Sequence, residues 1–107
     1  YAPSISFVSD RRKITLDPAE ILYVESNDSE VWIHTVEGGA YRTKTRISQW
    51  ETQLDSRFLR IHRSFIVNTA RLDRCCPGHV EIGGMTIEIS RKYREAARQR
   101  LKTAADA

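Results

Sequence analysis

The fold of this chain is decided between residues 58 and 68, by the stretch Phe58-Leu59-Arg60-Ile61-His62-Arg63-Ser64-Phe65-Ile66-Val67-Asn68. Its first half alternates, so we expect Arg60 and His62 on one face of a strand and Ile61 on the other. A second apolar run begins after Ser64. The stretch therefore predicts two short strands, with the cationic Arg63 at the point where the first strand ends.

A second informative segment is Ile89-Ser90-Arg91-Lys92-Tyr93-Arg94. It predicts a strand that ends at Ile89 and a helix that Ser90 caps and that runs from Arg91 to about Lys102. Cations in a first helical turn oppose the helix dipole, at a cost of a few tenths of a kcal/mol. A local rule broken in this way suggests a function, and the free backbone N–H groups there could bind a phosphate.

Short strands separated by turn residues make up most of the remaining sequence. We expect strands near residues 5–8, 13–16, 21–25, 31–35, 40–43, 71–75, 79–82 and 85–89. Gly38-Gly39 and Gly83-Gly84 predict hairpin turns. One helix at about residues 47–54, capped by Thr45 or Ser48, would bury Trp50. The pattern predicts a mainly β fold of antiparallel sheets with two short helices.

Length and composition indicate one ordinary globular domain. The chain has 107 residues, of which 40% are hydrophobic and 29% charged. We expect a single domain with a core at about residues 5–101 and a flexible tail at 102–107. No apolar run approaches the roughly 18 residues of a membrane span, and residues 1–4 do not resemble a signal peptide. The first residue is not Met, so we expect a fragment of a longer protein.

Positive charge is concentrated in the second half of the chain. Residues 1–56 carry six Lys or Arg and nine Asp or Glu, whereas residues 57–102 carry eleven and four. This asymmetry favours an anionic partner, with nucleic acid first among the candidates. A basic face that is merely solvated would explain the charge equally well.

The sequence predicts neither an enzyme nor a cofactor. Its three histidines lie on separate expected strands, and no hydrolase, metalloprotease or nucleotide-binding motif is present. The only cysteines are the neighbours Cys75 and Cys76, a spacing that favours two reduced thiols in a cytoplasmic protein over a disulfide or a metal site. We therefore expect no catalytic residue and no metal ligand.

Four segments together resemble one known family. Residues 57–68 resemble the signature of LytTR (LytR/AlgR-type) DNA-binding domains, roughly F-x-R-x-H-R-S-[YF]-[IL]-V-N. Residues 21–26 are similar to the earlier I-x-[YF]-[IFV]-E segment, and residues 47–54 to the short helix before the signature. Residues 87–93 resemble the final [IV]-x-[IV]-S-R-x-Y element. The resemblance extends over about residues 5–101.

The resemblance implies an elongated, nearly all-β domain that inserts loops, rather than a recognition helix, into successive grooves of duplex DNA. By position, it implies base contacts from Ser29, Glu30, Arg63 and Arg91. It implies contacts to the DNA backbone from Lys44, Arg46, Arg60, His62, Ser64 and Lys92. Glu30 would repel phosphate and could at best accept a hydrogen bond from a cytosine amino group.

The resemblance also implies a biological setting. Such domains commonly form the output end of bacterial two-component response regulators, after a receiver domain, while others are fused to membrane segments. The chain would then regulate transcription in the cytoplasm, binding promoter DNA as a dimer on repeated half-sites. The alternative from another class is a basic β-rich adaptor for RNA or an acidic protein, for which Trp32 and Tyr41 are the only plausible stacking residues.

Overall fold

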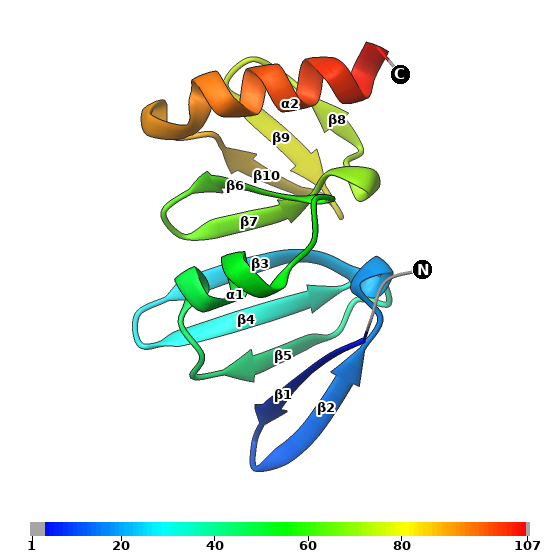
Figure 1. The fold of residues 1–107 in the computed structure, drawn as a ribbon, viewed down its shortest axis with the longest axis vertical. Coiled ribbons are helices and arrows are strands. Elements are labelled where there is room, and N and C mark those ends of the chain that lie inside the picture. Colours follow the sequence, from blue (N-terminus) through cyan, green and yellow to red (C-terminus); the bar gives the residue numbers. More distant parts are fainter. Residues whose placement is uncertain (1–3, 107) are drawn as a thin grey trace.

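Three antiparallel sheets follow one another along the longest axis of the molecule (Figure 1). The computed structural model describes residues 4–106, and side chains for residues 4–101. A five-stranded sheet in the order β5-β4-β3-β7-β6 lies in the middle, and two- and three-stranded sheets lie on either side of it. The principal extents are 40 × 32 × 25 Å. The mainly β architecture predicted from the sequence, with antiparallel sheets and two helices, is confirmed.

The elements have the following bounds. The central sheet contains β3 (Ile21–Asn27), β4 (Glu30–Thr35), β5 (Ala40–Thr43), β6 (Phe58–His62) and β7 (Phe65–Asn68). The flanking sheets contain β1 (Ile5–Ser9) with β2 (Arg12–Leu16), and β8 (Arg74–Cys75), β9 (His79–Ile82) and β10 (Met85–Glu88). The helices are α1 (Ile47–Gln53) and α2 (Arg94–Asp106), with 3-10 turns η1 (Pro18–Glu20), η2 (Thr69–Arg71) and η3 (Arg91–Tyr93).

The central sheet separates two hydrophobic clusters, because successive side chains of a strand point to opposite faces. On β7, Ile66 belongs to the cluster beneath α1, and its neighbour Val67 to the cluster beneath α2. The wholly buried Trp50 of α1 completes the first cluster, as the sequence predicted. Ala97 and Leu101 of α2 are buried in the second. Both faces of the sheet are therefore covered, which leaves its edges and turns for function.

Both helix starts differ from prediction. Neither Thr45 nor Ser48 caps α1, because Arg46 occupies the N-cap position without a side-chain cap bond and Ser48 lies inside the helix. Ser90 precedes the 3-10 turn η3 rather than an α-helix, and its side chain makes no cap bond. The predicted end near Lys102 is also wrong, since α2 continues to Asp106. Of the predicted tail, Ala107 lies outside the described residues.

Asn68 joins the end of β7 to the start of β3 from a buried position. Its side chain is almost wholly buried. Nδ2 donates to the Ile21 carbonyl at 2.8 Å, and Oδ1 accepts from the Ala70 N–H at 3.0 Å as the cap of η2. One amide thus satisfies both a strand carbonyl and a turn N–H that are distant in sequence, which accounts for a polar residue in this apolar setting.

We expect Asn68→Ala to lower the free energy of unfolding by about 1–3 kcal/mol, since both backbone groups would lose their partner inside the protein. Urea denaturation followed by circular dichroism measures the change. Asn27→Ala is the matched control, because Asn27 is exposed at the end of β3 and should change stability by less than about 0.5 kcal/mol. Equal effects of the two substitutions would contradict this role for Asn68.

Candidate nucleic-acid interface

Loops from four parts of the chain end on one edge of the molecule. In Figure 1 the β3–β4 turn, the β5–α1 connection, the β6–β7 turn and the start of η3 all lie along the left edge. Two backbone hydrogen bonds hold neighbouring loops in register. The Ser26 N–H donates to the Ser64 carbonyl at 2.8 Å, and the Ser90 N–H donates to the Ile61 carbonyl at 2.9 Å. The predicted base-contacting positions are therefore brought to the same edge.

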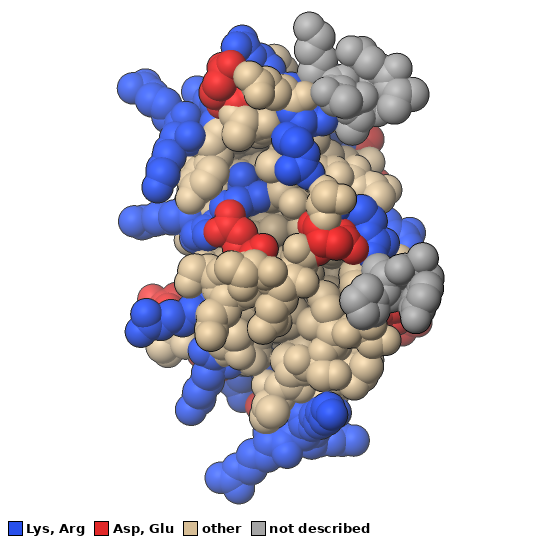
Figure 2. Space-filling model, viewed as in Figure 1, with Lys and Arg blue, Asp and Glu red and all other residues tan. Residues whose placement is uncertain are grey.

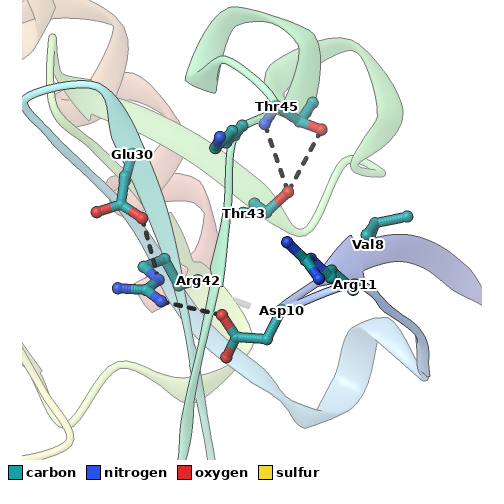
Figure 3. Close-up of a pocket in the computed structure, with 8 residues that line it drawn as sticks. Val8, Asp10, Arg11, Glu30, Arg42, Thr43 and Thr45 are labelled. Carbon is teal, nitrogen blue, oxygen red and sulfur yellow. Dashed lines mark hydrogen bonds and ion pairs between the residues drawn. The ribbon is translucent and has the colours of Figure 1, made fainter.

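The two predicted contact residues of the β3–β4 turn differ in their surroundings: Ser29 is exposed, whereas Glu30 forms an ion pair. Asp28 adopts a left-handed backbone with φ of 55°, which aspartate tolerates better than most residues, and Ser29 beside it is exposed. The Glu30 carboxylate forms an ion pair with Arg42 Nε at 3.0 Å, and the same guanidinium donates a hydrogen bond to Asp10 at 3.0 Å (Figure 3). The hydrogen bond to Asp10, followed by the charge of Glu30, raises the pKa of Arg42. Glu30 thus shares the positive charge of Arg42 with Asp10.

A depression of about 470 Å³ lies between the β3–β4 turn and the β5–α1 connection. It is lined by Ser29, Glu30, Lys44 and Arg46, four of the residues that the sequence nominated. Lys44 also lines a neighbouring hollow of about 450 Å³, which extends towards Asp10 and Arg11 of the β1–β2 turn (Figure 3). Exposed cations therefore border a concave surface next to the Ser29 turn.

Arg60 stabilises the β6–β7 turn through hydrogen bonds from its largely buried side chain. Its side chain is only 13% exposed and forms an ion pair with Glu51 of α1 at 2.8 Å. Nε donates to the His62 carbonyl at 2.8 Å, and a terminal nitrogen donates to the Arg63 carbonyl at 2.5 Å. The planar guanidinium fork suits these simultaneous bonds. Arg60 fixes the turn that carries Arg63, a role that the sequence did not indicate.

His62 and Ser64 complete the same turn. The Ser64 N–H donates to His62 Nδ1 at 3.1 Å, so in the neutral ring the proton lies on Nε2. The His62 ring packs edge-on against the Phe65 ring, with 5.6 Å between the ring centroids. Both residues are half-buried, whereas Arg63 between them is exposed. The phosphate contacts predicted for Arg60, His62 and Ser64 remain predictions, and their visible role is to shape the Arg63 turn.

Tyr93 connects this turn to the last loop. The Arg60 guanidinium lies 5.8 Å from the centre of the Tyr93 ring, and the Lys92 ammonium lies 5.5 Å from it, both within range of a cation–π interaction. Arg91, the first residue of η3, is exposed beside them. In the sequence Tyr93 is flanked by the cations Arg91, Lys92 and Arg94, but nothing there indicates that Arg60 packs on its ring.

Several cations on this edge have no carboxylate partner. Within residues 4–101, ion pairs involve Arg42, Arg57, Arg60 and Arg98 among the arginines. Arg57, for example, bonds to Asp55 at 2.6 Å and thereby lowers the pKa of that carboxyl. Five exposed cations on these four loops form no ion pair with any side chain of residues 4–101: Lys44, Arg46, Arg63, Arg91 and Lys92. Figure 2 shows Lys and Arg side chains projecting along this edge.

Comparisons with known proteins give the family and the fold of this chain. The family described as the LytTr DNA-binding domain matches residues 11–102. A solved LytTr DNA-binding domain from Bacillus cereus, from a protein named as a methyl-accepting/DNA response regulator, is similar in fold. The TM-score is 0.81 at 21% identity, covering 94% of this chain and 98% of that one. The comparison with curated proteins gives no match. Among the described residues, no helix is long and apolar enough to cross a membrane.

We expect Arg60→Ala to lower the free energy of unfolding by about 2–3 kcal/mol, because it removes bonds to two carbonyls and a carboxylate. Arg63→Ala removes the same charge from the exposed tip of the same turn and should change stability by less than about 0.5 kcal/mol. Urea denaturation distinguishes the two. Arg60→Lys should recover only part of the loss, since an ammonium cannot reproduce the fork. An unchanged free energy of unfolding in Arg60→Ala would refute the proposal that Arg60 stabilises the turn.

Proposed function

Since the chain belongs to the LytTR family of DNA-binding domains, we propose that it is the sequence-specific output domain of a bacterial transcription regulator of the two-component type. The observation that carries the proposal is that Lys44, Arg46, Arg63, Arg91 and Lys92 lie on loops at one edge of the molecule (Figure 1), exposed and without an ion pair among the described residues. Loops anchored to a sheet hold their side chains in place before binding, so less conformational entropy is lost on the DNA. The proposal is one of binding, with no catalytic step.

In the proposed complex the loops divide the work between base edges and phosphates. Arg63 and Arg91 are exposed at turn tips, where a guanidinium can donate two hydrogen bonds to guanine O6 and N7. Ser29 and Glu30 would contact a third position from the β3–β4 turn. Phosphates would be bound by Lys44, Arg46 and Lys92. The β6–β7 turn that carries Arg63 would be positioned by Arg60, His62 and Ser64.

The dimensions support contacts to successive grooves. The longest extent of the molecule is 40 Å, and the loop edge follows that axis in Figure 1. One turn of B-form DNA repeats every 34–36 Å or so. A single domain lying along the duplex can therefore reach more than one groove from one side, and two copies would bind repeated half-sites as a dimer.

We also propose the setting implied by the family: a domain that acts in the cytoplasm, joined to a receiver domain or a membrane segment. The adaptor alternative is less well supported. Trp32 is half-buried with Arg42 over its ring at 5.9 Å, and Tyr41 is half-buried against Phe7 at 5.9 Å. Both rings already pack against residues of this chain, whereas recognition of single-stranded RNA requires exposed rings on which bases can stack.

Selection from a randomised duplex pool at two salt concentrations tests the proposed function. We expect an enriched sequence motif, occurring as spaced repeats, and binding that weakens at the higher salt. Binding that is salt-sensitive but enriches no motif would contradict sequence-specific recognition. It would then favour the adaptor, which binding to single-stranded RNA in the same buffer would reveal.

On the selected duplex, Arg91→Ala and Arg63→Ala should each weaken binding by about 1–3 kcal/mol and relax the preference at one base pair. Lys92→Ala should weaken all sequences alike and reduce the slope of log K against log salt by about one. Fluorescence anisotropy over a salt series measures both effects.

Arg71→Ala is the matched control for these substitutions. Arg71 is an exposed arginine of η2, which follows the far end of β7, so the charge removed is the same but the loop edge is untouched. We expect its affinity to stay within about twofold of the unaltered chain, allowing for long-range electrostatics. An Arg91→Ala protein that keeps full affinity and sequence preference would exclude Arg91 as a base contact.

A further inference from the structure

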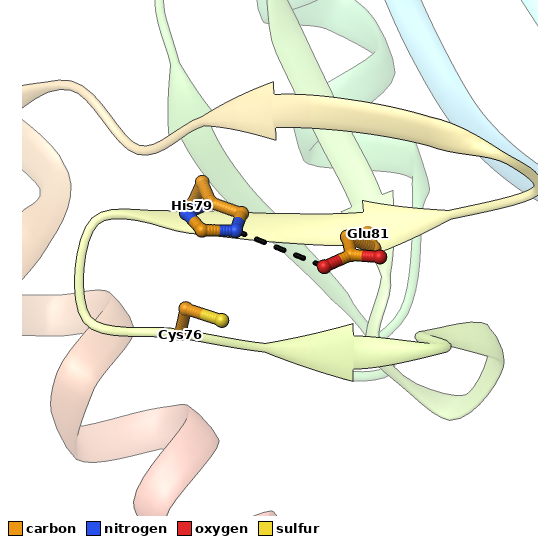
Figure 4. Close-up of side chains that lie close together, drawn as sticks. All are labelled: Cys76, His79 and Glu81. Carbon is orange, nitrogen blue, oxygen red and sulfur yellow. Dashed lines mark ion pairs between the residues drawn. The ribbon is translucent and has the colours of Figure 1, made fainter.

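The hairpin formed by β8 and β9 gathers three metal-binding side chains that the proposed function does not use. They are Cys76, His79 and Glu81, and one ligand atom from each lies within 4.8 Å of the others. Figure 4 shows the three side chains next to one another on the hairpin. The spacing of the two cysteines alone gave no indication of a site, because the other two ligands come from the opposite strand.

The backbone register explains this juxtaposition. Cys75 pairs with Val80 and Arg74 with Glu81, and the Cys76 N–H donates to the His79 carbonyl at 2.9 Å. Cys76 is therefore directly opposite His79. His79 and Glu81 are two residues apart on β9, so they project from the same face. This register of the hairpin therefore places the thiol, the imidazole and the carboxylate on the same face, next to one another.

We propose that these three side chains bind a single zinc ion or a divalent transition-metal ion with the same preference for thiolate. A cysteine, a histidine and a carboxylate are ligands that zinc takes in proteins, and three of them leave its fourth position for water. The thiolate disfavours Mg²⁺ and Ca²⁺, which prefer oxygen ligands. His79 Nε2 and Glu81 Oε2 are already 3.8 Å apart, close to the separation of two ligands around a tetrahedral ion.

The scaffold around the three ligands is well ordered by hydrogen bonds and packing. All three are half-buried, and Val80 between the two β9 ligands is fully buried in the second hydrophobic cluster. The carbonyl of Gly78, in the turn, accepts from the Ile89 N–H at 3.0 Å. A site whose backbone is fixed on both sides needs only side-chain rotations to close around an ion, which favours affinity.

Charges on the neighbouring strands also bear on the site. Glu88 of β10 pairs with His79 and is exposed, so its carboxylate is on the same face and adds negative charge. Arg74 pairs with Glu81 and opposes the ion with its positive charge, although among the described residues it forms no ion pair with Glu81. With Cys76 as thiolate, three negative groups face one positive group, which favours a cation.

Metal titration of the reduced, tag-free chain tests the site. Zn²⁺ binding is followed by calorimetry, and Co²⁺ binding by the absorption of thiolate-to-cobalt charge transfer. We expect one ion per chain and a cobalt–thiolate band. Cys76→Ser, His79→Ala and Glu81→Gln should each weaken Zn²⁺ binding by at least about tenfold, since even indirect support of a zinc ligand is worth that much.

The neighbouring cysteine supplies a matched control. Cys75→Ser changes an exposed thiol one residue away from the proposed ligand and should leave the affinity within about twofold and the cobalt band intact. An equal loss in Cys75→Ser and Cys76→Ser would overturn the proposal, as would one ion shared by two chains or the absence of a thiolate band. Far-UV circular dichroism checks that each variant folds. If Cys76→Ser does not fold, His79→Ala and Glu81→Gln still test the site.

Discussion

The pairing of β3 with β7 is the interaction on which the rest of the molecule depends. It pairs residues 23–25 with residues 65–67 in the middle of the central sheet and so links the two hairpins that carry the Ser29 and Arg63 turns. Because side chains alternate along both strands, this one ladder supplies residues to both hydrophobic clusters. The bond between Ser26 and Ser64 continues the same register to the loop edge. A slip of one residue would exchange the two faces and separate the turns.

Cations in the β6–β7 stretch have two distinct physical roles. Arg60 is largely buried, with three hydrogen-bonding partners, and stabilises the turn, whereas Arg63 is exposed and free of ion pairs among the described residues. An exposed arginine on a fixed turn is positioned for an anion without a competing carboxylate. The ordering entropy of the loop is already lost during folding, so it need not be lost again on binding. Glu30, by contrast, already forms an ion pair with Arg42, which competes with any contact between its carboxylate and a base.

The sequence predicted most of the strands because alternation and glycine turns are local signals. Periodicity alone predicted that Ile61 lies on the opposite strand face from Arg60 and that Trp50 is buried, and both side chains are wholly buried. What it did not predict depends on contacts between distant segments. Arg60 forms its ion pair with Glu51 of α1, and its guanidinium lies near the ring of Tyr93. The spacing of residues in the sequence identifies neither contact. The helix caps were mispredicted because Ser and Thr at a helix start are favoured on average, while Arg46 holds that position here.

The proposed metal site on the β8–β9 hairpin and the proposed DNA-contacting edge are connected through backbone hydrogen bonds, which limits what a bound ion could do. The turn between Cys76 and His79 is bonded through Gly78 to Ile89, two residues before Arg91. A ligand shifts a conformational equilibrium only by its difference in affinity for the two states, so an ion that binds the hairpin as it stands would stabilise the fold without moving Arg91. Its effect on DNA binding would then come chiefly from adding positive charge near η3, and would decline as salt increases.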